Sequence, residues 1–178
     1  AWTKFFKAAG FEGKMPRPVR GKGRGNTYDL FSTAIQNNQS KDLPLLLLDS
    51  EDALAANHST WQHLKTRDGF DKPNKANDEH AYLMVHVMET WLLADIESLQ
   101  TYFGSKFKPA KIPAWTDLEA VPKPNIFEAL KNATADCEKQ YGKGKISFEV
   151  LGSIDPKKVK ERCPNAKRFL DYLAKKLK

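Results

Sequence analysis

With 178 residues, 40% of them hydrophobic, the chain is long enough for one folded domain with a full core and a small helical extension. No apolar run approaches the about 20 residues of a membrane-spanning helix. The amphipathic opening stretch does not resemble a signal peptide, so we expect a cytoplasmic protein. The formal net charge is +7, and its uneven distribution along the chain matters more than its total.

The first half of the chain alternates helices and strands. Residues 1–10 predict the end of a helix and residues 14–20 a short extended segment. Residues 28–37 predict a helix with one apolar face, and the leucine-rich stretch 44–48 predicts an interior strand buried on both faces. Residues 81–87 predict a further strand that passes into a helix ending near residue 104. This order favours a mainly parallel sheet with right-handed crossovers.

The remaining segments are more polar or more helical. Residues 53–79 predict a long loop over the sheet edge, and the Pro- and Lys-rich residues 105–124 predict an irregular segment. Helices are expected over 125–137, 147–153 and 156–177, the last broken at Pro164.

The chain is therefore expected to be α/β, in two parts. Residues 1–104 form the α/β core, and residues 105–178 form a basic, mostly helical extension packed on it. Because the chain begins without Met in a predicted helix, we also expect a strand upstream of Ala1. Residues 139–178 carry twelve Lys and Arg against four Asp and Glu. Such a basic end commonly contacts phosphate backbones, and a solvated lysine-rich surface is the alternative.

Acidic side chains follow the leucine-rich strand. In an extended segment alternate residues point the same way, so Asp49 and Glu51 project to one side while Asp52 turns away. Ligands of parallel sheets sit beyond the carboxyl ends of the strands. Two hard carboxylate ligands there suit Mg²⁺ or Mn²⁺. The alternative is that Asp49 and Ser50 begin a turn or cap a helix.

Glu89 is a second candidate acid. On a helix it shares a face with Leu92 and Leu93, so its carboxylate lies beside side chains that should be buried. A buried acid needs a partner or a metal ion. The alternative is a boundary glutamate that reaches solvent or caps the helix start.

The stretch RGKGRGNT (residues 20–27) lies between a predicted strand and a predicted helix. Its glycines let main-chain amides approach an anion, and a helix N-terminus favours negative charge. Lys22 and Arg24 are therefore expected to contact phosphate, with Asn26 or Thr27 as a helix cap. The alternative is a mobile basic turn, since neither GxxxxGK[ST] nor GxGxxG is present.

Histidine and cysteine provide no recognised metal motif. None of the four histidines and two cysteines has zinc-finger, HExxH or CxxC spacing. We expect the histidines to be polar surface or satisfied core residues. Cys137 and Cys163 are expected to be free thiols.

Four blocks in order resemble an uncharacterised bacterial family catalogued as a domain of unknown function (4276), which is similar to Toprim-fold proteins. The blocks are PLLLLDSED, WQHLKTRDGFDKP, DEHAYLMVHVMETWLLAD and KGKISFEVLGSIDPKKV. The acid pair followed by ME-x-W-x-L-x-D also resembles RloB-like and OLD-type nuclease proteins of bacterial defence loci. The resemblance implies a Toprim-like, mainly parallel sheet flanked by helices, which places acids around Mg²⁺.

In residue terms, the resemblance implies that Asp49 and Glu51 are the metal-binding acid pair and that Glu89 adds a ligand. The family's first motif, a strand ending in Glu-Gly, would lie upstream of Ala1. The expected function is a Mg²⁺- or Mn²⁺-dependent phosphodiester hydrolase, a nuclease acting on DNA or RNA in anti-phage defence. The residues expected to hold the phosphates are Arg20, Lys22, Arg24, Asn26, Lys143 and Lys145.

Two other functions compete with a nuclease. One is a non-catalytic subunit that binds an ATPase partner protein through its helical half. The other is a small-nucleotide sensor that relies on the glycine-rich stretch.

Overall fold

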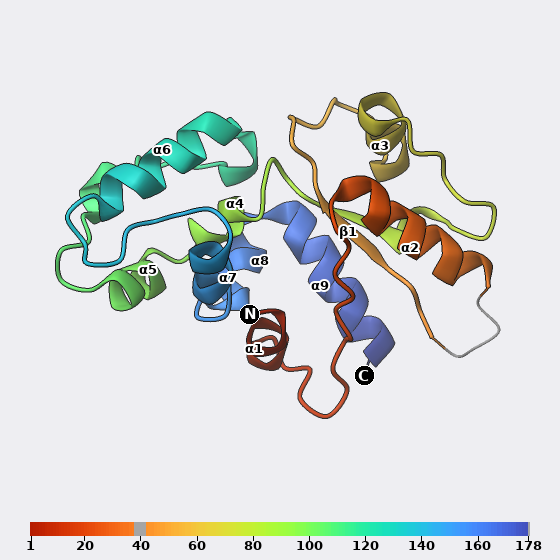
Figure 1. Ribbon diagram of the computed structural model, residues 1–178, viewed down its shortest axis with the longest axis horizontal. Helices are drawn as coiled ribbons and strands as arrows, with labels where there is room; N and C mark the ends of the chain where they lie inside the picture. The colour runs from red at the N-terminus through yellow and green to blue at the C-terminus, as the bar shows by residue number, and fades with distance from the viewer. Residues whose placement is uncertain (38–41, 178) are drawn as a thin grey trace.

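The computed structural model describes residues 1–37 and 42–177. Two parallel strands, β1 (Leu46–Asp49) and β2 (Ala81–Met84), lie between helices (Figure 1). Leu46 is paired with Ala81, and Asp49 with Met84. The predicted α/β class and parallel pairing are therefore confirmed. Within the described residues the sheet has these two strands and no others.

Helices surround this strand pair. Before β2 the chain forms α1 (Trp2–Ala8), α2 (Arg24–Gln36), α3 (Thr60–Asp68) and the 3₁₀ helix η1 (Asp78–His80). After β2 it forms α4 (Glu89–Leu92), α5 (Ile96–Phe103), η2 (Pro109–Lys111), η3 (Leu118–Ala120), α6 (Lys123–Thr134), α7 (Lys145–Leu151), α8 (Pro156–Arg162) and α9 (Pro164–Leu177). In the part of the chain that is described, no helix is long and apolar enough to cross a membrane.

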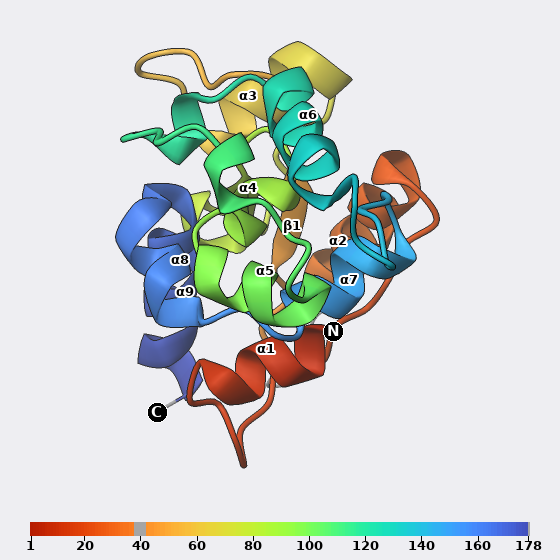
Figure 2. The same ribbon diagram turned by 90° about the vertical axis from the view of Figure 1, so that its left-hand side faces the viewer.

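The strand pair separates two hydrophobic clusters, because alternate residues of a strand point to opposite faces. Leu46 and Leu48 pack with side chains of α2 and α3. Tyr82 and Met84 pack with side chains of α9 and the larger cluster. Figure 2 shows α2 and α9 on opposite sides of β1. The leucine-rich strand is thus covered on both faces, as its composition predicts. The expected interior position is wrong for the described residues, because β2 is the sole strand paired with β1 there.

The larger cluster extends from α1 to α9. Trp91 is fully buried in it and stacks on Phe5 with 5.7 Å between ring centroids. Burying one large apolar side chain stabilises the fold by about 1.5–3 kcal/mol. Phe5 and Leu170 belong to the same cluster, so residues before and after position 104 share one core. The division into a core and an extension at that position stays a prediction.

Several predicted elements have different bounds in the structure. Residues 53–79 were expected to be a loop, and this is wrong because they contain α3 and η1. Ser59 begins α3 with a capping box in which Gln62 is the partner, a pattern that is visible in the sequence. The helix expected to run to residue 104 is interrupted after α4, because the Asp95 side chain accepts the N–H of Ser98 and begins α5.

The bounds of the C-terminal helices agree more closely with the sequence predictions than those of the earlier elements. The expected helices correspond to α6 and α7, and the third is divided at Pro164 into α8 and α9. Residues 105–122 are irregular apart from two 3₁₀ turns, and α6 begins at Lys123, inside the segment expected to be irregular. Cys137 and Cys163 are both buried free thiols, as expected.

Candidate functional site

The carboxyl ends of the two strands are joined by main-chain hydrogen bonds beyond the paired residues. Ser50 N–H donates to the Met84 carbonyl and Glu51 N–H to the His86 carbonyl, each at 2.8 Å. The Ser50 hydroxyl accepts the N–H of His86 at 2.7 Å. We call these two segments, residues 49–52 and 85–89, the strand-end junction.

Two residues of the strand-end junction have left-handed backbone conformations. Glu51 has φ 64° and His86 has φ 57°. This conformation costs a residue with a side chain roughly 1–2 kcal/mol. The hydrogen bond from Glu51 N–H to the His86 carbonyl, and that from His86 N–H to the Ser50 hydroxyl, hold both residues in place. Such strain clusters at functional sites, so the junction is a candidate site on conformational grounds alone.

Asp49 ends β1, one residue later than predicted, and its carboxylate reaches the segment that follows β2. Its Oδ1 accepts the N–H of Met88 at 2.8 Å, which brings it beside Glu89 at the start of α4. Burial raises the pKa of Asp49 to about 7, and the negative charges of Glu89 and Glu51 add to this effect. The structure therefore brings all three predicted acids into electrostatic contact.

Glu89 is buried, with 2% of its surface exposed, as its helical position predicts. Its Oε1 accepts hydrogen bonds from Ser147 Oγ at 2.8 Å and from Tyr141 Oη at 3.1 Å. Burial and the charge of Glu89 raise the pKa of Tyr141. The sequence patterns connect neither hydroxyl with this carboxylate, because both lie far along the chain.

Glu51 is held by an ion pair with Lys123 at the start of α6. The expected extended run from Asp49 through Glu51 is wrong, because β1 ends at Asp49 and Glu51 is left-handed. Alternation along a strand therefore does not explain how these acids are oriented. Asp52 is exposed and forms an ion pair with Arg67 at 3.0 Å.

The donor chemistry of this site fits a hydrated divalent cation. No group of three or more His, Cys, Asp or Glu side chains is arranged to hold a metal ion in residues 1–37 and 42–177. Mg²⁺, however, keeps several waters and binds through one or two carboxylates plus substrate phosphates. Asp49 and Glu51 are carboxylates of that kind. Burial and, after it, the negative charges of Glu89 and Glu51 raise the pKa of Asp49, and a cation would offset those charges.

Arg24 lies in the first turn of α2, which begins four residues earlier than predicted. Its guanidinium binds both carboxylate oxygens of Asp68, at 3.0 and 2.5 Å, and donates to the Asp49 carbonyl at 2.5 Å. It therefore ties α2 and α3 to the end of β1. The expected helix cap at Asn26 or Thr27 is wrong, because both residues lie inside α2 and Gly23 is the N-cap residue. Asn26 instead accepts the main-chain N–H of Lys22 at 2.9 Å. Their predicted phosphate contacts stay predictions.

The remaining predicted phosphate ligands gather around α7. Arg20 lies over the ring of Phe148 at 5.4 Å, and Lys145 is exposed, 4.0 Å from Glu149. Lys143 lies over Phe127 at 5.4 Å, and its positive charge acts on Asp49 against the rise in pKa. Lys143 is thus a predicted phosphate ligand that also interacts electrostatically with Asp49.

A cleft of about 370 Å³ opens beside the strand-end junction. Its lining residues are Glu51, Asp52, Ala53, Arg67, His86, Pro122, Lys123 and Pro124. Burial lowers the pKa of the His86 imidazole. The expected satisfied core histidine is found at His63, whose Nε2 lies 2.9 Å from the Ser50 carbonyl oxygen. The expectation is wrong for His86, whose buried Nε2 has no hydrogen-bond partner among the described residues.

These features define an α/β protein with an acidic site at the carboxyl ends of two parallel strands. The chain belongs to the family described as Domain of unknown function (DUF4276), whose model matches residues 11–174. No significant match to a curated protein or to a solved structure was found. The predicted family is thus confirmed, and the similarity to Toprim-fold, RloB-like and OLD-type proteins stays a prediction.

Proposed function

We propose that this protein is a Mg²⁺-dependent phosphodiester hydrolase that acts on nucleic acid, with Asp49, Glu51 and Glu89 as its acidic centre. The observation that carries the proposal is the 2.8 Å hydrogen bond from Met88 N–H to Asp49, which holds this carboxylate beside Glu89, the residue after Met88. In parallel sheets this edge is where ligands bind. A Toprim-like fold, a cytoplasmic location and a role in anti-phage defence belong to the same proposal.

Each acid has a distinct part in this proposal. Asp49 and Glu51 would hold the cation, which when bound orients a water molecule and stabilises charge on the phosphate. The Met88 amide orients the carboxylate of Asp49. The hydroxyls of Tyr141 and Ser147 fix the carboxylate of Glu89, so its negative charge stays beside Asp49.

The cations around this centre are expected to bind the phosphate backbone. Lys143 is exposed and its charge already acts on Asp49, so it places a phosphate beside the acids. Arg20 and Lys145 extend the positive surface around α7. Lys123 is paired with Glu51 and must release this carboxylate when a cation binds.

Thermal melting with and without Mn²⁺ tests the metal site. We expect Mn²⁺ to raise the melting temperature of the wild type and of the control Asp52→Asn, because binding to the folded state alone stabilises it. Asp49→Asn should show no such rise and should melt without metal at the same or a slightly higher temperature. Equal Mn²⁺ shifts in both variants would show that Asp49 is not a ligand.

Cleavage of end-labelled RNA and DNA, single- and double-stranded, then tests the activity. We expect Mg²⁺-dependent cleavage of at least one of these substrates by the wild type and by Asp52→Asn. Asp49→Asn should not cleave it. Metal binding without cleavage of any substrate would overturn the proposed activity.

A second candidate function is a non-catalytic subunit that binds an ATPase partner protein. The observation that favours it is the exposure of large apolar side chains, at 63% for Val19, 42% for Leu30 and 40% for Leu43. An interaction subunit has no need of a cation at the acids. Absence of any Mn²⁺ shift in the wild type, together with co-purification of an ATPase, would favour this function.

A further inference from the structure

The cleft beside the strand-end junction has the size of a small-molecule site. Its volume of about 370 Å³ lies in the range of ligand pockets. Pro122 and Pro124 provide rigid apolar walls, and Arg67 and Lys123 provide positive charge. Glu51 lines this cleft and also acts electrostatically on Asp49, so the cleft adjoins the acidic centre.

His86 presents an unused hydrogen-bond acceptor to this cleft. Its side chain lines the cleft although only 5% of its surface is exposed. The backbone of Glu119 lies close enough to the imidazole ring to act on its pKa. In the described residues Nε2 has no hydrogen-bond partner, and in a neutral imidazole it can accept a hydrogen bond through its lone pair. A buried acceptor without a donor is unfavourable, so a ligand N–H is stabilised here.

One of the carboxylates that hold the two cations of the cleft is exposed enough for a ligand anion to replace it. Arg67 pairs with Asp52 at 3.0 Å, and 69% of the Asp52 side chain is exposed. Arg67 also pairs at 2.6 Å with Asp68, whose side chain is 8% exposed, and Lys123 pairs with Glu51. Exposed ion pairs contribute little to stability, so exchanging Asp52 for a phosphate requires little free energy. A guanidinium also matches a phosphate geometrically. The cleft therefore combines a site for an anion with a site for an N–H donor between apolar walls.

We propose that this cleft binds one nucleotide unit, with a base N–H donating to His86 Nε2 and the phosphate beside Arg67 and Lys123. The base lies between Pro122 and Pro124. This inference rests on the proposed function. In a nuclease, the cleft would hold the nucleotide next to the phosphodiester that is cleaved.

Binding of the four common ribonucleoside 5′-monophosphates tests this subsite. These probes have no phosphodiester to cleave, and EDTA removes divalent cations, so the measurement does not depend on catalysis. We expect saturable binding by calorimetry for at least one of them. The ¹⁵N signal of His86 Nε2 should shift on binding, and that of His58, which lines a different cleft, should not.

Two variants and one control locate the binding site. Arg67→Gln should weaken binding about tenfold, because a charged donor is removed. Lys65→Gln, on the same helix and outside the cleft, should leave binding unchanged. His86→Asn should also weaken binding about tenfold, since asparagine tolerates the left-handed backbone but places its acceptor elsewhere. Melting curves establish that each variant is folded.

Absence of saturation with all four mononucleotides would overturn the inference. Equal affinities of the Arg67→Gln and Lys65→Gln variants, or a shift of His58 instead of His86, would also overturn it. Cleavage of nucleic acid by a protein that binds no mononucleotide would overturn this subsite alone. Mononucleotide binding at His86 without cleavage would overturn the proposed hydrolase alone.

Discussion

Tyr141 donates a 3.1 Å hydrogen bond to the buried carboxylate of Glu89 and so ties the segment between α6 and α7 to the start of α4. The Tyr141 ring also stacks on Phe127, with 6.3 Å between centroids, and Lys143 lies over Phe127. The segment that satisfies the buried acid therefore also carries the exposed lysine whose charge acts on Asp49. Packing of this segment and charge at the acidic centre are coupled.

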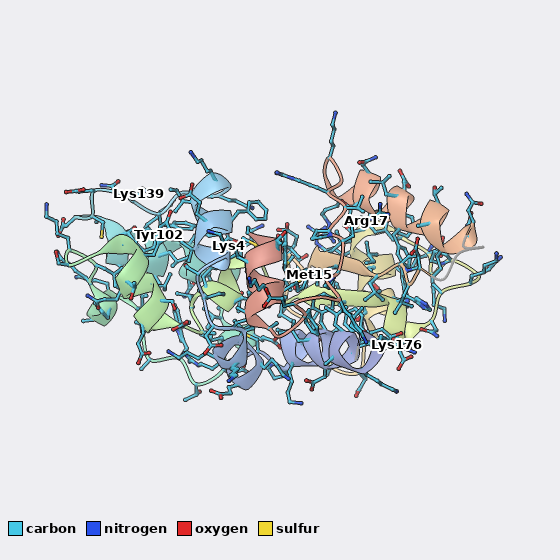
Figure 3. The ribbon with its side chains drawn as sticks, turned by 90° about the horizontal axis from the view of Figure 1, so that it is seen from below. Lys4, Met15, Arg17, Tyr102, Lys139 and Lys176 are labelled. Carbon is cyan, nitrogen blue, oxygen red and sulfur yellow. The ribbon has the colours of Figure 1, made fainter. Side chains whose placement is uncertain are left out.

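Removal of the Tyr141 hydroxyl should destabilise the fold. We expect Tyr141→Phe to lower the free energy of unfolding by about 1–3 kcal/mol, because a buried charged acceptor is deprived of a donor. Tyr102→Phe is the matched control, since Tyr102 also donates to a glutamate, Glu149, but at the surface. Figure 3 shows Tyr102 beside Lys139, whose ammonium lies 5.4 Å from the ring centroid. Urea denaturation measures both effects, and equal destabilisation would contradict the prediction.

The raised pKa of Asp49 predicts a stability that falls as the pH rises. Its folded-state pKa of about 7 lies above the ordinary 3.8, so the folded state holds this proton more tightly. The resulting stabilisation is complete below pH 3.8 and disappears as the pH rises through 7. Between these limits the stability of the wild type should fall by on the order of 3 kcal/mol more than that of Asp49→Asn. Guanidinium denaturation without divalent cations measures the free energy of unfolding of both proteins at each pH. Parallel curves of this free energy against pH would contradict the prediction.

Arg24 can be tested for a structural role against a phosphate-binding role. Arg24→Lys keeps the positive charge but cannot form the two-pronged interaction with Asp68 together with the bond to the Asp49 carbonyl. We expect the free energy of unfolding to fall by about 1–2 kcal/mol, with nucleic-acid affinity retained. Lys22→Gln, whose side chain is exposed, serves as the stability control. Unchanged stability with weakened binding would instead assign Arg24 to phosphate.

Lys143 and Lys145 should contribute to binding through charge. Replacing both with glutamine should weaken binding of a single-stranded oligonucleotide regardless of its sequence. The slope of log K against log salt should become shallower by about 0.7 for each phosphate that is no longer neutralised. Lys157→Gln on α8 is the control for the basic C-terminal end. Fluorescence anisotropy at several salt concentrations measures the affinity and its salt dependence. Weaker binding by Lys157→Gln alone would contradict the prediction and place the phosphate-binding surface on α8.

Much of the secondary structure follows from short-range patterns. The leucine run predicts β1, and Pro164 predicts the division between α8 and α9. Helix α3 is not predicted although Ser59 and Gln62 form a capping box, because its polar composition outweighs that signal. The left-handed turn at Glu51 has no such local pattern, since glutamate rarely adopts it.

By itself the sequence determined that Asp49 and Glu89 are candidate functional acids. Asp49 comes directly after the predicted apolar strand, and Glu89 shares a helix face with leucines that should be buried. Only the tertiary structure decided what surrounds them. The Met88 amide orients Asp49, and the Tyr141 and Ser147 hydroxyls hold Glu89. His86, whose Nε2 has no partner in residues 1–37 and 42–177, lines a cleft. These interactions join residues far apart in the chain. Local periodicity fixes which face of an element is buried, whereas helix packing determines which distant side chains meet there.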